Sequence, residues 1–322
     1  MVEEIRENVS IVIPIYGVEK YIERCVRSLF EQTLDSLEYI FVNDCTPDRS
    51  VEILERVLEE YPQRREQVRI INHETNLGAA IARKNGILAA TGEYIIHCDS
   101  DDWVDKNMYF DMYAKAKLED LDVVICAYNR CSTTTKDIIY QQLGDNPLST
   151  VLSKPILCSL WNKLVRRELI TTNDFRYPEH HMMEDVAICA QMFYYAKSVG
   201  YIDKPLYNYI VHDESISHDQ REVVCVKRWR DTCSNVELII TFLKDKGCTS
   251  RYIEELISLK YCVRGFLWSL LKKDLKYYPQ WYNTFKELNY QFLFAKSLSM
   301  SQKFLFLVTL LGLYTLISKF KR

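Results

Sequence analysis

Glycine and proline are both scarce in this sequence, with 9 and 8 residues among 322. Their scarcity excludes collagen-like and low-complexity chains, and 12% aromatic residues with a net charge of only −3 exclude intrinsic disorder. The 11 cysteines form no Cys-x-x-Cys pair and zinc ligands are not clustered, so we expect reduced thiols used as small core residues. Because the acidic start of the chain lacks an apolar leader, we expect a cytoplasmic protein.

The sequence also lacks a conventional transmembrane segment. Its nearly apolar run at 304–317 has 14 residues and would span about 21 Å as a helix, short of a hydrocarbon core of about 30 Å. Basic residues flank this run, and no acid follows Phe292. The tail therefore suits a helix lying in the bilayer interface, with a helix packed into the core as the alternative.

The small net charge hides an asymmetry between the two parts of the chain. Residues 221–322 carry 18 basic and 8 acidic side chains, whereas residues 1–220 carry 23 and 36. Such a split can indicate two working surfaces, of which the basic one meets something anionic, although solvated helix faces would produce the same count.

Apolar runs and amphipathic stretches alternate over the first 125 residues. Strands separated by helices of about a dozen residues predict βαβ units and a mostly parallel sheet. Residues 130–220 look irregular, and residues 221–290 look helical. The predicted strands are 9–16, 39–42, 68–71, 94–98 and 123–128, and the predicted helices are 20–32, 50–61, 79–90 and 108–119.

Carboxylates follow two of these strands directly. Asp44 comes after the second strand and Asp99 after the fourth, and ligands of parallel sheets bind beyond the carboxyl ends of the strands. Asp99 opens the run Asp-Ser-Asp-Asp-Trp, with three carboxylates in four positions. Hard oxygen ligands in a short, open cluster suit Mg²⁺ or Mn²⁺ shared with a phosphate, and an acidic turn that caps the next helix is the alternative.

Several motifs in order resemble glycosyltransferase family 2, over roughly residues 8–218. The family consists of inverting enzymes with the GT-A fold, so the resemblance implies an α/β protein whose mostly parallel nucleotide-binding sheet is flanked by helices. A helical region would follow it toward the C-terminus. The matching segments are Val12-Ile-Pro-Ile-Tyr16, Val42-Asn-Asp-Cys-Thr-Pro-Asp48, Asn76-Leu-Gly-Ala-Ala-Ile-Ala-Arg83, Thr91-Gly-Glu-Tyr94, Asp99-Ser-Asp-Asp-Trp103, Trp161-Asn-Lys-Leu164, Glu184-Asp185 and Pro205-Leu-Tyr-Asn-Tyr209.

The resemblance implies a division of the chain into domains. A glycosyltransferase domain would occupy residues 1–218, with a nucleotide-sugar half at about 8–128 and an acceptor half at about 129–218. A helical extension at 219–290 and a basic amphipathic tail at 291–322 would follow. The sequence departs from the family pattern at Lys84, where Asn is common, and at Cys45, where the usual Asp-Gly-Ser reads Asp-Cys-Thr.

By the same resemblance, one set of residues would bind the donor, most simply a UDP-sugar, and its metal ion. Pro14, Ile15 and Tyr16 would line the pocket of the base, and Asp44 would accept a hydrogen bond from it. Arg83, Asp99 and Ser100 would lie against the nucleotide, with Asp99 at the ribose or in the water shell of the metal. Asp101 would bind Mn²⁺ or Mg²⁺, and His212 would approach the metal or the diphosphate. The structural alternatives are a helix-surface Arg83 that pairs with Glu93 or Asp99, and an exposed loop His212.

A second set would serve the acceptor. Asp185 would be the general base that takes a proton from the acceptor hydroxyl, since a carboxylate of ordinary pKa can do so when held close to it. Glu184 would position the site. Trp161, Asn162 and Lys163 would form an acceptor-side wall, with buried packing the alternative for Trp161.

The sequence thus predicts an inverting, metal-dependent glycosyltransferase that moves a sugar from a nucleotide-diphosphate donor to a glycan or lipid-linked glycan, of the kind that builds bacterial surface polysaccharides. We expect it to work peripherally at the inner face of the plasma membrane, with no nucleic-acid partner. A nucleotidyltransferase would normally have a loop rich in glycine and basic residues after the first strand. The loop at 16–20 has only one glycine and one lysine, so this alternative is disfavoured. A non-catalytic sugar-nucleotide-binding or scaffold protein of the same fold is the remaining alternative.

Overall fold

The computed structural model describes residues 8–211 and 221–313, which form two compact units. We describe each unit by itself. The first comprises Met1–Leu143, Ser159–Glu179 and Gln191–Asp213, and the second comprises Gly144–Cys158, His180–Ala190 and Glu214–Arg322.

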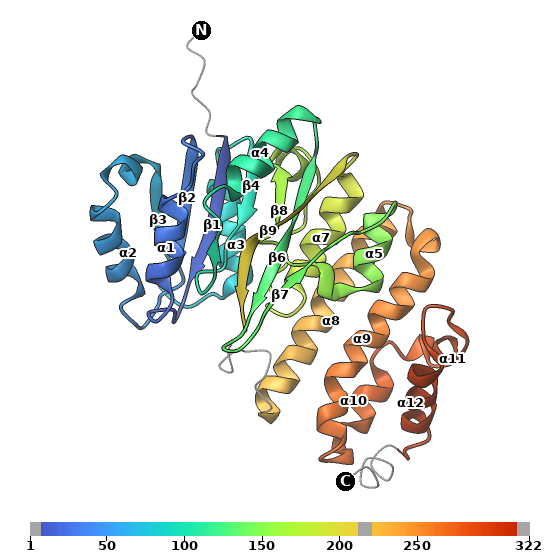
Figure 1. Ribbon diagram of the computed structural model, residues 1–322. Helices are drawn as coiled ribbons and strands as arrows, with labels where there is room; N and C mark the ends of the chain where they lie inside the picture. Colours follow the sequence, from blue (N-terminus) through green and yellow to red (C-terminus); the bar gives the residue numbers. More distant parts are fainter. Residues whose placement is uncertain (1–7, 212–220, 314–322) are drawn as a thin grey trace. The chain divides into compact units, whose positions relative to one another are not determined.

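The N-terminal part of the first unit is a parallel sheet with the strand order β3-β2-β1-β4 (Figure 1). Each strand and helix predicted before residue 128 is present, with its ends shifted by a few residues. The strands are β1 (Val9–Ile15), β2 (Leu37–Asn43), β3 (Val68–Asn72) and β4 (Tyr94–His97), and the helices are α1 (Ile22–Phe30), α2 (Ser50–Glu59), α3 (Ala79–Ala89) and α4 (Met108–Leu118).

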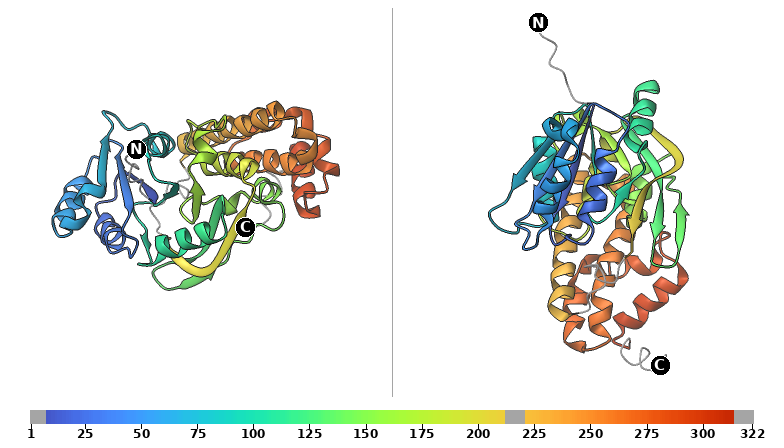
Figure 2. Two further views of the ribbon diagram at one scale, coloured as in Figure 1. Left: turned by 90° about the horizontal axis from the view of Figure 1, so that it is seen from above. Right: turned by 60° about the vertical axis from the view of Figure 1, so that its left-hand side comes forward.

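Helices cover both faces of this sheet, α1 on one and α3 on the other (Figure 2). Side chains alternate between faces along a strand, so Ile11 and Ile13 of β1 join the core formed with α1, α2 and α4. Val12, between them, faces α3, where Gly86 leaves room for it. Burial on both faces explains why the central strands read as continuous apolar runs.

The sheet continues beyond β4 through mainly antiparallel pairs, with β6 and β9 parallel, and β6 alone among these strands was predicted from the sequence. Beyond β4 the order is β8-β6-β9-β5, with β7 paired to β6. The expectation of irregular structure over residues 130–220 was therefore wrong for much of this segment, because its strands are short or interrupted by polar residues. The strands beyond β4 are β5 (Trp103–Val104), β6 (Val123–Cys131), β7 (Lys136–Ile139), β8 (Lys163–Arg166) and β9 (Val199–Ile210), of which β7, β8 and β9 lie within residues 130–220. They are accompanied by α6 (Glu168–Thr171) and part of α7 (Glu184–Tyr195).

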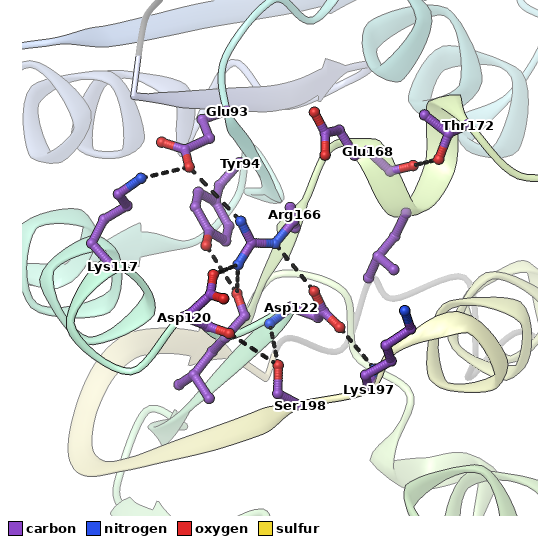
Figure 3. A network of polar contacts seen from close by, with 12 residues as sticks. Glu93, Tyr94, Lys117, Asp120, Asp122, Arg166, Glu168, Thr172, Lys197 and Ser198 are labelled. Atoms are coloured by element: carbon purple, nitrogen blue, oxygen red, sulfur yellow. Dashed lines mark hydrogen bonds and ion pairs between the residues drawn. The ribbon is translucent and has the colours of Figure 1, made fainter.

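Arg166 joins several of these elements in one polar network (Figure 3). Its guanidinium lies 2.7 Å from Asp120 and 3.1 Å from Asp122, and it stacks over the Tyr94 ring at 5.2 Å. Asp122 also accepts a hydrogen bond of 2.8 Å from the Lys197 amide. The register pairs Arg166 with Tyr94, the first residue of β4. The network therefore fastens the end of the sheet opposite the carboxyl ends of the parallel strands.

The second unit is helical, as the sequence predicts for residues 221–290. A buried arginine lies at the centre of its aromatic core, since Arg264 is 0% exposed and its guanidinium lies about 5 Å from the rings of Trp281, Phe292 and Phe306. Its helices are α5 (Pro147–Ser153), the start of α7, α8 (Glu222–Asp245), α9 (Ile253–Leu271), α10 (Tyr278–Asn283), α11 (Gln291–Phe294) and α12 (Met300–Leu310).

Helix α12 is both packed and exposed. Ser299 and Gln302 form a capping box at its start, and Phe306 is fully buried in the aromatic core. On its other side, Phe304 and Leu311 are each 62% exposed. Within the described residues, no helix combines the length and apolar character needed to cross a membrane.

Candidate active site

The parallel strands bring the predicted donor residues to one edge of the sheet. Ile15, the last residue of β1, pairs with Asn43, the last of β2, and Val12 pairs with His97, the last of β4. The residues that follow these strands therefore emerge together. The amide of Asp44 donates a hydrogen bond of 3.0 Å to the carbonyl of Ile15, which ties two of the strand ends.

Asp44 is held by the loop that precedes α3. Its carboxylate accepts hydrogen bonds from the amides of Leu77 at 2.8 Å and Gly78 at 2.6 Å, and the ring of His73 lies 2.7 Å away. The side chain is 4% exposed. Each carboxylate oxygen carries two lone pairs, so this anchoring leaves capacity for one more donor. A contact from Asp44 to the base stays a prediction.

The turn after Asp44 keeps a glycine-like backbone without a glycine. Cys45 has a φ of 55°, in the left-handed region that costs a side-chain-bearing residue roughly 1–2 kcal/mol. The following Thr46 hydroxyl accepts from the Gly17 amide at 2.9 Å, and Asp48 accepts from the Glu19 amide at 2.9 Å. The loop that carries Tyr16 is thus fastened to the loop after β2.

The hydrogen bonds of Asp48 have an electrostatic consequence. Burial raises the pKa of this carboxyl, but hydrogen bonds from Ser50, Thr46 and the Glu19 amide outweigh burial and hold the pKa below its usual value. Asp48 is therefore a stable anion that organises the two loops.

Arg83 and Asp99 form an ion pair at the end of β4. The guanidinium lies 2.8 Å from the carboxylate, and the two side chains are 13% and 29% exposed. The next residue, Ser100, is buried and donates its hydroxyl to the carbonyl of Pro14 at 2.7 Å. Four predicted donor residues are therefore linked directly, while Tyr16, 51% exposed, lies open to solvent.

The three carboxylates of the acidic run have different surroundings. Asp102 is 1% exposed and accepts hydrogen bonds of 2.7 Å from the Tyr207 hydroxyl and the Ile210 amide, both on β9. Burial, with the nearby charges of Asp101 and Asp99, raises the pKa of Asp102 well above its ordinary value. The Tyr207 hydroxyl in turn accepts from the Asp99 amide at 3.1 Å. The sequence motif containing Tyr207 was visible, but this role in fixing the acidic run was not predicted.

The carboxylates of the acidic run suit a divalent cation that takes most of its ligands from water and from substrate phosphates. Among the described residues, no three His, Cys, Asp or Glu side chains gather closely enough to enclose a metal. Asp99 is paired with Arg83 and Asp102 is buried, whereas Asp101 is half-buried. Mg²⁺ is commonly held by one or two carboxylates together with waters and substrate phosphates, so these residues suit such an ion.

The predicted acceptor wall is largely interior. The Trp161 ring stacks on Tyr207 at 4.2 Å and on Tyr209 at 5.8 Å, and Tyr128 meets its edge at 4.7 Å. Asn162 and Lys163 are 0% and 1% exposed. Buried packing is the alternative expected for Trp161, and a polar network buries Asn162 and Lys163 as well.

The polar network is centred on Gln141. Its side-chain oxygen accepts hydrogen bonds from the side-chain amide of Asn162 at 2.9 Å and from the ammonium of Lys163 at 3.1 Å. Lys163 also donates to the Ser159 carbonyl at 2.7 Å. Asn162, which directly precedes β8, also donates to the Cys126 carbonyl of β6 at 3.0 Å, so the network fixes β8 beside β6.

Asp185 and Glu184 belong to the second unit, in the first turn of α7. A negative charge is favoured there by the helix dipole. The preceding residue, Met183, has a φ of 65°, an uncommon conformation for a buried methionine. On α8, Asn235 donates hydrogen bonds of 2.8 Å to the carbonyls of His180 and Met182 and so fixes this turn. His212 lies outside the described residues.

One contact beside the acidic run was not predicted. The guanidinium of Arg24 lies 3.7 Å from the ring centre of Trp103, the residue after Asp102. Hollows of about 610 and 560 Å³ in the first unit are both lined by Trp103, Val104 and Lys106.

Comparison with known sequences assigns the family. The profile of the family described as Glycosyl transferase family 2 matches residues 10–188. The chain belongs to this family. It is 31% identical over 259 residues to the putative glycosyltransferase EpsH of Bacillus subtilis (strain 168), which covers 77% of this chain and 72% of that protein. The predicted family and the glycosyltransferase activity are thereby confirmed.

Solved structures confirm the predicted fold class. The structure of S. aureus TarS 1–349 in complex with UDP-GlcNAc matches with a TM-score of 0.70 and 22% identity, covering 95% of this chain and 88% of that one. The mannosyltransferase PcManGT from Pyrobaculum calidifontis, in complex with GDP-Man and Mn²⁺, matches with a TM-score of 0.57 and 14% identity, covering 98% and 87%. At these identities the likeness establishes a shared GT-A fold.

Proposed function

We propose that this glycosyltransferase moves a sugar from a nucleotide-diphosphate donor, most simply a UDP-sugar, to a hydroxyl of a glycan or lipid-linked glycan. The observation that carries the proposal is the acidic run at the end of β4, where Asp99 pairs with Arg83 at 2.8 Å and Ser100 is bound to Pro14 of β1. The relatives with this fold include one bound to UDP-GlcNAc and one bound to GDP-Man with Mn²⁺.

In this proposal, the donor lies across the carboxyl edge of β1, β2 and β4. Tyr16 flanks the base and Asp44 accepts a hydrogen bond from it, while Asp99 faces the ribose. Ile15 is 0% exposed in the core, so we assign it to supporting this edge of the sheet in place of direct contact with the base. Asp101 holds Mn²⁺ or Mg²⁺, with His212 approaching from the segment after β9. The cation would neutralise charge that develops on the departing diphosphate.

Asp185 is the proposed general base. It would take the proton of the acceptor hydroxyl as that oxygen attacks the anomeric carbon, and a single displacement would invert the configuration. Glu184 would orient the acceptor. The burial of Trp161, Asn162 and Lys163 leads us to assign them to positioning the acceptor half of the fold, in place of direct contact.

We also propose that α12 rests on the inner face of the plasma membrane. The exposed residues Phe304, Leu307 and Leu311 are spaced three and four apart and so share one side of the helix. Lys296 and Lys303 add positive charge nearby in the sequence, within the part of the chain that has 18 basic and 8 acidic side chains. Apolar burial and attraction to anionic lipids would act together.

The decisive experiment measures donor binding and sugar transfer separately. A panel of nucleotide sugars is screened by thermal shift with and without Mn²⁺, since a ligand at 100 Kd stabilises the folded state by about 2.7 kcal/mol. We expect one nucleotide sugar to raise the melting temperature when Mn²⁺ is present and not when it is absent. Asp101→Asn should abolish this Mn²⁺-dependent rise. Asp137→Asn, at an exposed position on β7, is the matched control and should behave as wild type.

The same samples separate the enzyme from a non-catalytic scaffold. Asp185→Asn should retain the donor-dependent thermal shift and lose transfer, by roughly 10²–10⁴-fold if it removes general-base catalysis. Asp145→Asn, another exposed acid of the second unit, is its control. Equal transfer by wild type and Asp185→Asn would reject the assigned base, and donor binding without turnover in wild type would favour the scaffold.

A further inference from the structure

A hollow of about 460 Å³ lies within the helical second unit, far along the chain from every predicted site residue. Its volume is in the range of roughly 300–1,000 Å³ that is typical of small-molecule sites. Helix α8 forms one wall, and α10 with the two residues after it forms the other. The lining residues are Trp229, Cys233, Glu237, Pro279, Gln280, Asn283, Thr284 and Phe285.

The walls are fixed by hydrogen bonds behind them. The indole N–H of Trp229 donates to the Thr284 hydroxyl at 3.2 Å, and that hydroxyl donates to the Gln280 carbonyl at 2.7 Å. The fully buried Arg264 donates to the Thr284 carbonyl at 2.6 Å and to the Asn289 side chain at 2.6 Å. Trp229 is therefore held in place by both walls.

The backbone at the hollow is strained. Phe285 has a φ of 51°, and a non-glycine residue in this region persists only where its surroundings impose it. The anchored Thr284 carbonyl lies directly before it. The phenyl ring of Phe285 contributes to the lining, and the ammonium of Lys260 lies 4.9 Å from the centre of that ring.

The lining combines apolar rings with unused polar groups. Trp229, Pro279 and Phe285 supply ring surfaces, while the side-chain amides of Gln280 and Asn283 make no hydrogen bond to another described residue. Glu237 is the one charged residue of the lining, which contains no Lys, Arg or His. The carboxylate would repel a phosphate or an acidic lipid, and the exposed amides offer hydrogen bonds that a purely apolar ligand could not use.

We propose that this hollow binds a neutral sugar ring of the acceptor glycan. A pyranose offers an apolar C–H face to aromatic rings and hydroxyls to amides and a carboxylate, which is the combination that the lining provides. The inference rests on the proposed glycan acceptor. It adds a second contact for a growing chain, made by residues that take no part in donor binding or in the chemical step.

The test uses the full-length protein and a panel of neutral methyl glycosides, with methyl glucuronide as the anionic probe, measured by saturation-transfer NMR. We expect one or more neutral glycosides to bind and the glucuronide to bind about tenfold more weakly or not at all. Gln280→Ala with Asn283→Ala, both exposed, should weaken neutral-glycoside binding by about tenfold, and Asn283→Trp should block it by filling the hollow. Tyr290→Ala, at an exposed aromatic outside the hollow, is the control and should bind as wild type.

Transfer assays distinguish failure of this inference from failure of the proposed function. The Gln280 and Asn283 variants should keep the wild-type rate on a short acceptor and show a raised KM on a longer glycan. Glycoside binding that survives Asn283→Trp, or an unchanged KM on long glycans, would overturn the inference while leaving donor binding and Asp185 untouched. An absence of binding by every neutral glycoside would overturn it as well.

Discussion

A histidine lies inside the strand that leads to the acidic run. His97 is 7% exposed, its Nδ1 has no hydrogen-bond partner among the described residues, and burial, with the charge of Arg83, lowers its pKa to about 3. An unfolded histidine has a pKa near 6.5, so the unfolded chain binds more protons between pH 6.5 and 3. The contribution of neutral His97 to the free energy of unfolding is therefore fully present above pH 6.5, and it is lost as the pH drops from 6.5 toward 3.

Replacement of this histidine by an apolar residue of similar size removes that dependence. We expect His97→Leu to reduce the loss of unfolding free energy between pH 7 and pH 5 by about 2 kcal/mol. Urea unfolding at pH 8, 7, 6 and 5 provides the measurement, and pH 8 isolates the effect of packing because both states are then neutral. Parallel pH profiles for wild type and variant would show that His97 does not titrate as described.

Contacts were predictable where the partners belong to neighbouring motifs and unpredictable where the partners are distant in sequence. Arg83 and Asp99 lie in neighbouring motifs, 16 positions apart, and the structure pairs them, which is the contact expected for the alternative of a helix-surface Arg83. Tyr207 reaches Asp102 across 105 positions, so nothing in either local pattern announces the bond. The left-handed Cys45 stands where the Asp-Gly-Ser pattern of the family resemblance has glycine, so the departure from that pattern pointed to this turn.

At the scale of elements, burial on both faces made the parallel strands easy to predict. β1 and β2 are almost wholly buried and read as apolar runs between amphipathic helices. β7, with three exposed residues of four, and β9, with Asp203 and Lys204 at its centre, lack such runs. β9 pairs with β6 through contacts distant in sequence, such as Val123 with Val199, whereas β7 forms a local hairpin with β6 in which Cys131 pairs with Lys136.

Two glycines inside helices test how closely the elements pack. A Cβ added at Gly86 of α3 would lie 2.3 Å from a methyl of Val12 on β1, whereas one at Gly265 of α9 would meet only the Trp268 ring at 3.7 Å. We expect Gly86→Ala to destabilise the fold by about 1–3 kcal/mol through overpacking. Gly265→Ala should be neutral or stabilising by up to about 1 kcal/mol, because alanine favours helix. Chemical denaturation of both variants compares them, and equal effects would show that α3 does not pack on β1 this closely.

For the whole molecule, the charge asymmetry corresponds to a structural division only in part. The acidic residues that bind the proposed donor lie in the first unit, but Asp185 lies in the second, because residues 180–190 group with the helices. The segments 144–158 and 180–190 belong to the second unit although the residues around them belong to the first. These segments are short, so the sequence pattern does not show where the chain passes from one unit to the other.

The structure also changes how membrane contact by α12 must be tested. Deletion of this helix would remove the fully buried Phe306 from the aromatic core, and loss of a phenylalanine from a core costs about 3–5 kcal/mol. A truncated protein would therefore unfold its second unit whether or not α12 touches lipid. Substitutions on the exposed side avoid this problem.

We expect Phe304→Ser with Leu311→Ser to lower binding to vesicles rich in anionic lipid by about tenfold or more, because burial of each side chain contributes about 1.5–3 kcal/mol. The melting temperature should stay close to that of wild type, since both residues are 62% exposed. Val223→Ser with Ile253→Ser, at exposed apolar positions elsewhere in the second unit, is the matched control and should co-sediment as wild type. Raising the salt concentration should weaken the binding of all three proteins through screening of the basic residues. Equal co-sedimentation of the α12 variant and the control would remove the membrane from the proposed function and leave the sugar transfer standing.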